Sequence, residues 1–251
     1  VIQEQNSFPG LTTRRYANKV DRVYLGFGEA LSHLKPGVKA VNTGNPVRDE
    51  IGLPSREEGL AHFQLSSSKK TILILGGSQG SRSINNSVLK DFENLSSECQ
   101  LIWQTGQSDF ESIRDKVGDR MEDGTLFAFH DRIELAYAAA DIAIARAGAL
   151  TIAELLVSET PALLAPYPHA AGDHQTKNAQ MSLTRGVAEI VEDRNLNSEN
   201  LIDKACQIAQ SSKCIEMRDA IRKWNYERPP RASETICRDL VKLLRERGKL
   251  S

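Results

Sequence analysis

The sequence has no long apolar segment and no strong net charge of either sign, and these two absences exclude several classes of protein. No segment approaches the roughly 18 to 20 apolar residues that a membrane-spanning helix needs. Residues 1–20 carry polar and charged groups throughout, so no signal peptide is visible. The formal net charge of −1 excludes an overall basic field that would recruit nucleic acid. With 40% apolar and 26% charged residues, we expect an ordinary globular protein.

Cysteine is also scarce. The chain has four cysteines, with no C-x-x-C pair and no Cys/His cluster at zinc spacing. We therefore predict neither a metal nor another cofactor. We expect free, partly buried thiols in a reducing compartment at Cys99, Cys206, Cys214 and Cys237.

Short apolar segments alternate with helical patterns along most of the chain. Strands are predicted at 71–75, 100–104, 125–129, 141–145, 162–165 and 186–191. Helices are predicted between them, at roughly 81–94, 108–117, 131–139, 149–158, 174–184 and 198–210. This alternation indicates an α/β fold with a doubly wound parallel sheet. Such sheets bind ligands at the carboxyl ends of their strands.

The two ends of the chain differ from this central part. Residues 1–45 contain two more predicted strands, at 21–27 and 39–43, with a helix near 11–19; the Gly44–Val47 segment then resembles a hinge. The chain opens with Val-Ile and no methionine, so we interpret its start as the cut end of a strand. After Pro229-Pro230, a final helix carries apolar residues on one face and basic residues on the other. The basic face either contacts anionic lipid or is simply solvated.

A glycine-rich turn, Gly76-Gly77-Ser78-Gln79-Gly80-Ser81, follows the strand at 71–75 and opens a helix. Small residues let backbone N–H groups approach a ligand, and a helix N-terminus adds partial positive charge, so the turn suits a phosphate. The Ser78 hydroxyl can donate one more hydrogen bond. The pattern is neither the Rossmann fingerprint nor a P-loop, and a tight turn without a ligand is the alternative.

A second turn, Arg146-Ala147-Gly148, follows the strand at 141–145 and also opens a helix. Two such turns in one sheet indicate a bipartite ligand. Glu154 lies early in this helix, and a carboxylate accepts two hydrogen bonds at once, which suits the vicinal hydroxyls of a ribose. Compensation of the helix dipole is the alternative for Glu154. The backbone amides that can hold a phosphate or sugar oxygen are those of Ala149, Leu150 and Thr151.

Three further places contribute candidate residues. After the strand at 162–165, Asp173 can cap a helix that begins with His174 and Gln175, whose side chains would face the same mouth. Metal binding by His169, Asp173 and His174 is the less favoured alternative, because the surroundings suit hydrogen bonding to a sugar. Arg48 either meets a phosphate across a cleft or is a surface arginine near a bend. Asn6 can bind sugar hydroxyls.

Five segments in this order resemble the MurG family of glycosyltransferases. They are Gln3–Asn6 with Pro9–Thr12, Gly44–Arg48, Gly76–Ser81, Arg146–Thr151 and Pro168–Asn178. The resemblance implies the GT-B fold, in which two doubly wound domains face a cleft. It implies a remnant of the N-terminal acceptor domain at 1–45 and a complete, Rossmann-like donor domain at 46–228. A last segment, 229–251, would return to the first domain.

The resemblance also implies an activity. The family transfers N-acetylglucosamine, with inversion, from UDP-N-acetylglucosamine to undecaprenyl-pyrophosphoryl-N-acetylmuramoyl-pentapeptide, the step from lipid I to lipid II in peptidoglycan synthesis. It implies a role in cell shape and cell division. The partners are then this donor, this acceptor and the membrane surface, without nucleic acid. The implied location is the bacterial cytoplasm, peripheral on the cytoplasmic face of the inner membrane.

By this resemblance, each candidate residue takes a place around the donor. Ser78 would contact the diphosphate, and the loop at His130 would hold uracil through its backbone. Glu154 would bind the ribose hydroxyls. The sugar pocket would be lined by Ala149 and Leu150, with the neighbouring Thr151, together with His174 and Gln175. Asn6 and Arg48 would reach in from the domain junction.

The sequence departs from the family pattern in two respects. Gln3 stands where family members often have histidine. The family's N-terminal glycine-rich loop, its proposed general base and its membrane-facing patch have no counterpart, a difference of roughly a hundred residues by ordinary domain size. We therefore assign no catalytic residue and expect this chain to bind the donor only. The alternatives are a UDP-N-acetylglucosamine 2-epimerase-like enzyme and a non-catalytic nucleotide-sugar-binding module.

Overall fold

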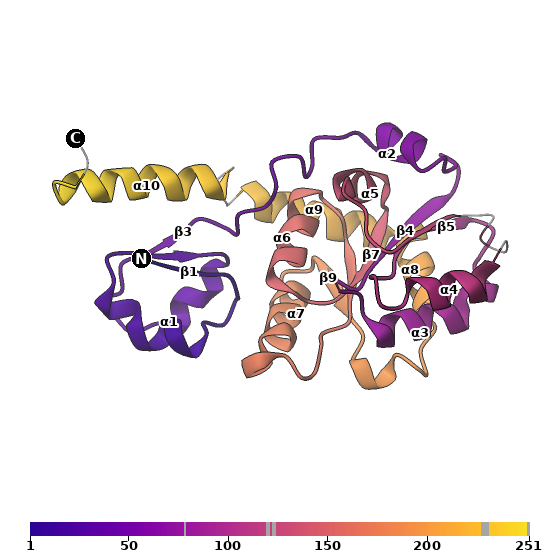
Figure 1. Ribbon diagram of the computed structural model, residues 1–251, viewed down its shortest axis with the longest axis horizontal. Coiled ribbons are helices and arrows are strands. Elements are labelled where there is room, and N and C mark those ends of the chain that lie inside the picture. Colours follow the sequence, from indigo (N-terminus) through magenta and orange to yellow (C-terminus); the bar gives the residue numbers. More distant parts are fainter. Residues whose placement is uncertain (78, 119–120, 122–123, 227–230, 250–251) are drawn as a thin grey trace.

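The computed structural model describes residues 1–77, 79–118, 121, 124–226 and 231–249, and it contains two parallel sheets. The smaller sheet has the order β1 (Ile2–Glu4), β2 (Val23–Leu25), β3 (Ala40–Asn42). The larger sheet has six strands and lies beside it (Figure 1). No helix in the described part of the chain is long and apolar enough to cross a membrane.

The six-stranded sheet is wound in two directions from its centre. Its strands are β4 (Lys70–Leu75), β5 (Cys99–Gln104), β6 (Gly124–Phe127), β7 (Ile142–Ala145), β8 (Ala162–Leu164) and β9 (Ala188–Ile190), in the order β6-β5-β4-β7-β8-β9. Every neighbouring pair is parallel. The prediction of a doubly wound parallel sheet is therefore confirmed. The winding direction reverses between β4 and β7, so the ligand crevice of this fold class is expected outside their carboxyl ends.

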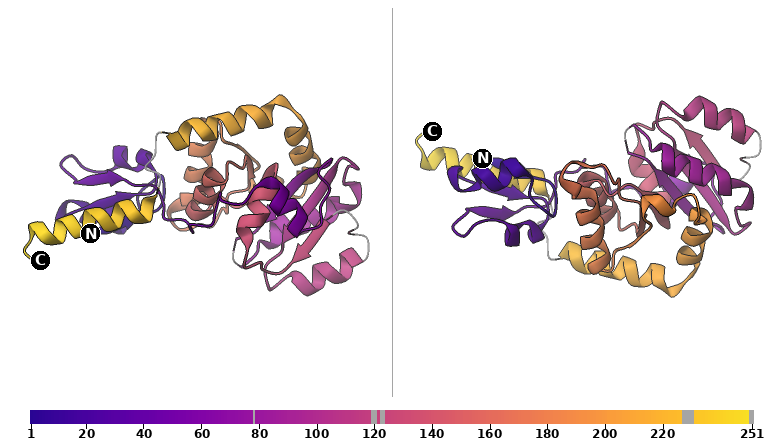
Figure 2. Two further views of the ribbon diagram at one scale, coloured as in Figure 1. Left: turned by 90° about the horizontal axis from the view of Figure 1, so that it is seen from above. Right: turned by 90° about the horizontal axis from the view of Figure 1, so that it is seen from below.

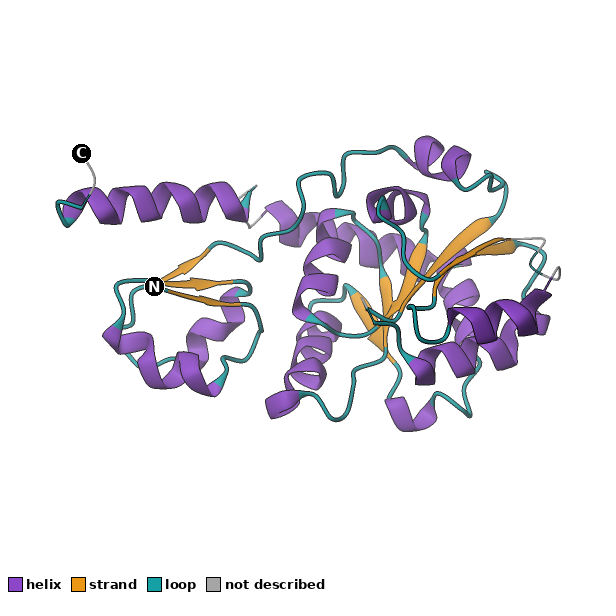
Figure 3. Ribbon diagram, viewed as in Figure 1, coloured by secondary structure: helices purple, strands orange, loops and turns teal. Residues whose placement is uncertain are grey.

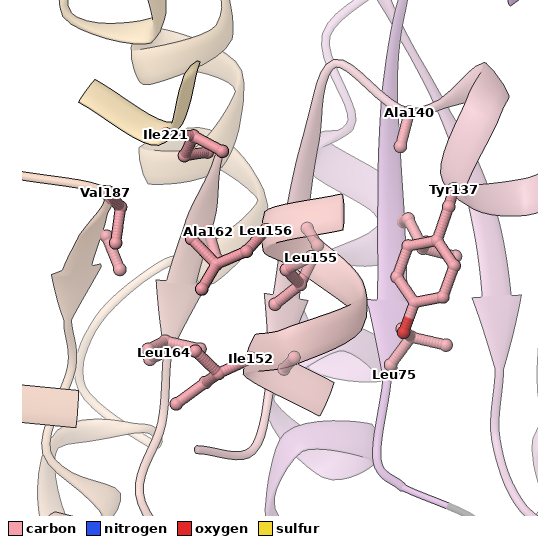
Figure 4. Close-up of a cluster of buried hydrophobic side chains, with 14 of the residues drawn as sticks. Leu75, Tyr137, Ala140, Ile152, Leu155, Leu156, Ala162, Leu164, Val187 and Ile221 are labelled. Carbon is pink, nitrogen blue, oxygen red and sulfur yellow. The ribbon is translucent and has the colours of Figure 1, made fainter. Parts of the chain in front are cut away.

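Side-chain alternation along the strands builds one apolar core on each face of this sheet. In β4, Ile72 and Ile74 point to one face and Leu73 and Leu75 to the other. The first face is covered by α3 (Arg82–Asp91), α4 (Phe110–Val117) and α8 (Leu201–Gln210). The second face is covered by α2 (Arg56–His62), α5 (Ile133–Ala139), α6 (Ala149–Val157), α7 (His174–Thr184) and α9 (Ser212–Tyr226). Figure 3 shows these helices around the strands, and Figure 4 shows part of the second core.

The smaller sheet is packed between local helices and the last helix of the chain. Val23 and Leu25 face a core that includes Ala17 of η1 (Ala17–Lys19), which continues α1 (Leu11–Tyr16), and Ala30 of η2 (Gly28–His33). Tyr24, between them, points the opposite way and donates to Asp239 Oδ2 of α10 (Ala232–Glu246) at 2.9 Å. Burial, and the hydrogen bond to Asp239, raise the pKa of Tyr24 to about 12.

The chain passes between the two sheets twice. The first passage runs from β3 to α2 and includes Gly44, whose φ of 77° is left-handed. The second runs from α9 to α10, and α10 lies along the smaller sheet in all three views (Figures 1 and 2). The basic face of α10 is exposed at Arg238, Lys242 and Arg245. The domain boundaries at residues 45 and 229 remain predictions.

Two sequence-based expectations need correction or completion. Cys99 of β5 and Cys206 of α8 form a disulfide, with Cα atoms 6.4 Å apart, so the prediction of free thiols is wrong for this pair. Spacing along the chain carries no sign that a strand and a helix so distant in sequence face each other. Cys214 and Cys237 are free as expected. The helices α2 and α9 were not predicted.

Candidate functional site

The two glycine turns lie side by side at the point where the winding of the sheet reverses. Leu75, the last residue of β4, pairs with Ala145, the last residue of β7. The first turn packs closely on the end of β5, since a Cβ at Gly80 would overlap the Thr105 carbonyl oxygen. Gly77 has a φ of +85° and open space around it. Ser78 lies outside the described residues.

The second turn leads directly into α6, whose first residue is Ala149. Gly148 is the N-cap residue, and its extended backbone leaves the first N–H groups of the helix without acceptors in the helix. Ala149 is buried, whereas Leu150 is 43% exposed. The amide groups predicted to hold a phosphate or sugar oxygen therefore lie at a helix N-terminus beside the first turn.

A cavity of about 290 Å³ is lined by the first turn, by helix α6 after the second turn, and by the linker between the sheets. Its lining includes Gly77 from the first turn, Thr151 and Glu154 from α6, Arg48 from the linker, and Phe129 from the loop after β6. Phe129 is 57% exposed. The structure thus brings Arg48, Thr151 and Glu154 together with the neighbour of Ser78 around one space.

Glu154 is held in this cavity by a buried tyrosine. Tyr137 of α5 is 2% exposed, and its hydroxyl donates to Glu154 Oε2 at 2.8 Å. Burial raises the pKa of Glu154, while the Tyr137 hydrogen bond and the charge of Arg48 act in the opposite direction. Among the described residues, Glu154 Oε1 has no protein donor. One carboxylate oxygen is therefore fixed by Tyr137, and the other has no protein donor in the described part of the chain.

Arg48 extends from the linker to the loop that precedes α5. Its Nη1 donates to the Asp131 carbonyl oxygen at 3.1 Å, and its Nη2 lies 3.6 Å from Glu134 Oε2. The Arg48 side chain is 47% exposed. Its guanidinium therefore lies at the rim of the cavity and retains access to solvent and ligand.

His130 is placed beside the cavity but is not among its lining residues. Its backbone N–H donates to Gln104 Oε1 at 3.3 Å. Its Nδ1 accepts from the Arg132 backbone N–H at 3.1 Å, so the proton of the neutral ring is on Nε2, which lies 3.2 Å from His62 Nε2. Burial, and then the neighbouring His62, lower the pKa of His130.

The remaining predicted residues lie toward the smaller sheet. Asn6 and His174 line a separate cavity of about 610 Å³. Gln175 Oε1 accepts from the Tyr167 backbone N–H at 2.9 Å, which fixes the loop after β8. Helix α7 begins at His174 as predicted, but Asp173 is left-handed and forms no side-chain cap, so that part of the prediction is wrong.

Arg146, directly after β7, contacts the loops that follow β4, β8 and β9, a role that was not predicted from the sequence. It is 8% exposed; Nε donates to Ser81 Oγ at 2.9 Å, and Nη1 donates to the Ala165 carbonyl oxygen at 2.9 Å. It also forms an ion pair with Asp193 at 2.7 Å and donates to Ser83 Oγ. The sequence did carry a signal for this role, an arginine directly after an apolar strand. Such a position favours burial, and a buried guanidinium requires several hydrogen-bond or charge partners.

Asn178 of α7 joins the two sheets and was also missed as an individual residue. It is fully buried, and its Oδ1 accepts from the backbone N–H and the hydroxyl of Ser7, at 3.0 and 2.9 Å. Its Nδ2 donates to Asn6 Oδ1 at 3.1 Å and to the Ala147 carbonyl oxygen at 3.2 Å. This side chain therefore connects the loop after β1 to the second glycine turn.

Comparison with known proteins places this geometry in a family. Residues 71–229 match the model of the glycosyltransferase family 28 C-terminal domain. The UDP-N-acetylglucosamine--N-acetylmuramyl-(pentapeptide) pyrophosphoryl-undecaprenol N-acetylglucosamine transferase of Flavobacterium psychrophilum is 37% identical over 247 residues, covering 97% of this chain and 66% of that protein. The transferase of the same name from Chlorobaculum tepidum is 36% identical over 244 residues, again with coverages of 97% and 66%.

A solved structure agrees with the sequence relatives. The crystal structure of Acinetobacter baumannii MurG has a TM-score of 0.74 to this chain, with 26% identity, and the match covers 96% of this chain and 66% of that one. The GT-B fold class expected from the sequence is confirmed. The chain spans 66% of the length of each of these three relatives.

Proposed function

The chain belongs to glycosyltransferase family 28, and on this basis we propose that its six-stranded part binds UDP-N-acetylglucosamine as the donor of a sugar transfer. The observation that carries the proposal is the cavity of about 290 Å³ lined by the first glycine turn and by Thr151 and Glu154 of α6. Its volume is near the lower limit for a small-molecule site and suits the nucleotide part of the donor. The sugar would then extend from this cavity toward His174.

The diphosphate is assigned to the amide groups of the two turns. The turn at Gly76–Ser81 and the N-terminus of α6 present N–H groups next to each other, because β4 and β7 are neighbours. Ser78, Ala149, Leu150 and Thr151 belong to this part of the proposed site. Arg48 would add a guanidinium from the linker, for which the diphosphate competes with the Asp131 carbonyl oxygen.

The nucleoside is assigned to the opposite end of the same cavity. Glu154 Oε1 would accept from the ribose hydroxyls while Tyr137 holds Oε2. Uracil would lie near Phe129 and bind the backbone of His130. The His130 N–H is bonded to Gln104 Oε1, so uracil would have to displace that amide side chain. The sugar is assigned to the side of His174, Gln175 and Asn6.

The chemistry we propose is inverting transfer of N-acetylglucosamine. The acceptor hydroxyl attacks the anomeric carbon, the bond from this carbon to the UDP oxygen breaks, and UDP leaves with the electron pair. Arg48 and the turn amides would stabilise the negative charge that develops on UDP. The proton of the acceptor hydroxyl must pass to a base. We assign no described residue of this chain to that step.

The names of the related enzymes supply the proposed acceptor. They describe transfer to an N-acetylmuramyl-(pentapeptide) pyrophosphoryl-undecaprenol. We propose the same acceptor, and hence peptidoglycan synthesis, for the whole protein to which this chain corresponds. Because that acceptor carries a lipid, the reaction would take place at the cytoplasmic surface of the membrane. The roles in cell shape and cell division belong to this proposal.

Calorimetry on the 251-residue chain tests the proposal directly. We expect UDP and UDP-N-acetylglucosamine to bind, with CMP as a control that does not bind. We also expect no lipid-linked disaccharide when the chain is incubated with donor and lipid-linked acceptor. Release of UDP with N-acetylmannosamine would instead identify an epimerase. Absence of UDP binding at millimolar concentration would contradict the donor site.

A further inference from the structure

The cavity of about 610 Å³ that contains Asn6 and His174 has a chemistry different from that of the donor cavity. It lies between the loop after β1 with the start of α1 on one side, and the start of α7 on the other. No acidic side chain is found among its lining residues, all of which belong to the described part of the chain. The side chains that matter here are Asn6, Phe8, Leu11, Arg14, His174 and Lys177.

Two cations share one aromatic ring in this cavity. The Lys177 ammonium lies 3.9 Å from the centroid of the Phe8 ring, and the Arg14 guanidinium carbon lies 5.1 Å from it. Lys177 also donates to the Gly172 carbonyl oxygen at 2.9 Å. Within the described ranges, neither cation forms an ion pair with a carboxylate. Their charges therefore produce a positive potential in a hollow with partly apolar walls.

The walls of the cavity are fixed by buried hydrogen bonds. Glu4 is 5% exposed; its Oε2 accepts from the Gly10 backbone N–H at 2.9 Å and from Thr13 Oγ1 at 2.6 Å. Its Oε1 accepts from the Asn6 backbone N–H at 3.1 Å. On the other side, Asn178 holds Ser7 and the second glycine turn together. The cavity is therefore set in shape before a ligand arrives.

We propose that this cavity binds the peptide of the acceptor, with Arg14 and Lys177 contacting its C-terminal carboxylate. The inference rests on the proposed function, because His174 and Asn6 are assigned to the transferred sugar and also line this cavity. A group bound here would therefore lie next to that sugar. Phe8 and the 74% exposed Leu11 suit a peptide better than a pyrophosphate, because they offer apolar surface in place of amide donors.

The test measures binding of soluble N-acetylmuramoyl-pentapeptide to the 251-residue chain in the presence of saturating UDP. The variant is the double substitution Arg14→Gln, Lys177→Gln. The matched control is Arg15→Gln, Lys19→Gln, which removes the same charge from two exposed cations that lie over the Tyr16 ring. We expect about tenfold weaker peptide binding for the first pair and less than twofold change for the control. UDP affinity should stay within twofold in both.

Further arms separate the possible outcomes. A muramoyl-pentapeptide with an amidated C-terminus should bind the unaltered chain about as weakly as the peptide with a free C-terminal carboxylate binds the Arg14→Gln, Lys177→Gln variant. Inorganic pyrophosphate should not compete with the peptide; full competition would assign the cavity to the pyrophosphate and overturn the proposal. Equal peptide binding by both double variants, or no peptide binding at about 10 mM, would also overturn it. If the unaltered chain does not bind UDP, the result would instead contradict the proposed donor site.

Discussion

Replacement of Glu154 by glutamine separates the binding role of this residue from its cost to the fold. The amide keeps the size of the side chain, and its oxygen can still accept from the Tyr137 hydroxyl, 2.8 Å away in the present structure. It removes the negative charge and replaces the second acceptor oxygen, Oε1, by a donor group. The ribose hydroxyls would therefore lose their proposed charged acceptor, while the contact with Tyr137 remains.

The expected magnitude follows from the hydrogen bonds involved. A hydrogen bond to a charged group contributes roughly 1.5–3 kcal/mol, and a neutral one roughly 0.5–1.5 kcal/mol. Loss of the Oε1 acceptor should therefore weaken UDP binding by about 1–3 kcal/mol, or roughly 5- to 150-fold. Glu154→Ala should fall in the same range. For Glu154→Gln we expect the free energy of unfolding to rise or stay the same, because burial raises the pKa of Glu154 and its charged form is disfavoured in the fold.

The assay is calorimetric titration with UDP, with thermal melting of the same samples at pH 7. The raised pKa means that the folded state loses stability as pH rises above the ordinary value of 4.5, so the uncharged glutamine should melt no earlier than glutamate. Glu111→Gln, at an exposed position of α4, is the control; it should leave UDP affinity unchanged and change the melting temperature little, because it removes only a surface ion pair with Arg114. Unchanged UDP affinity in Glu154→Gln would refute the ribose assignment.

Three further predictions concern the junction, the histidine pair and α2. Asn178→Ala should lower the free energy of unfolding by about 2–4 kcal/mol, since it leaves buried partners unpaired; urea denaturation should show this, and the exposed Thr176→Ala should not. The pKa of His130 is lowered in the folded protein, so its contribution to the free energy of unfolding should be fully present above about pH 6.5. Below that pH the free energy of unfolding should decrease, by at most about 1.4 kcal/mol per pH unit. A pH profile of urea midpoints that is unchanged in His130→Gln would disprove this. Ser55→Ala should cost about 1 kcal/mol by removing the capping box of α2, and an unaltered melting temperature would contradict it.

The four central strands of the larger sheet, β4, β5, β7 and β8, could be predicted because they are buried on both faces. The predicted strand at 71–75 corresponds to β4 (Lys70–Leu75), and its β-branched and apolar residues supply both cores. The order of the strands could not be predicted in the same way. Periodicity records burial, and the pairing of β4 with β7 depends on contacts between residues about seventy positions apart.

The two unpredicted helices differ in how visible they were. For α2 the sequence carries a capping box, with Ser55 followed by Glu58, and the structure forms both of its hydrogen bonds. This signal was available. For α9 the buried residues are Cys214, Met217, Ile221 and Trp224, a helical spacing that is interrupted by many charges. Only the packing of α9 on α6 and the sheet makes that face an apolar contact.

The site was predictable as a set of loops and not as a set of contacts. Glycine turns after strands indicate where amides are exposed, and the structure places the first turn and the helix that follows the second turn at one cavity. The Tyr137 bond to Glu154 and the Gln104 bond to His130 join different elements and leave no local pattern. Whether Ser78 contacts a diphosphate remains a prediction, because that residue lies outside the described part.

The double passage of the chain between the sheets has a mechanical consequence. A domain attached to another by one flexible linker can rotate about every axis. Residues that follow β3, such as Thr43 and Asn45, and residues at the start of α10, such as Arg231 and Ala232, line one pocket, so the two attachments lie side by side and together restrict this rotation. Together with the bonds from Asn178 to Ser7 and Asn6, the two attachments keep Asn6 aligned with His174 across the cavity. A bound sugar would meet both edges in register.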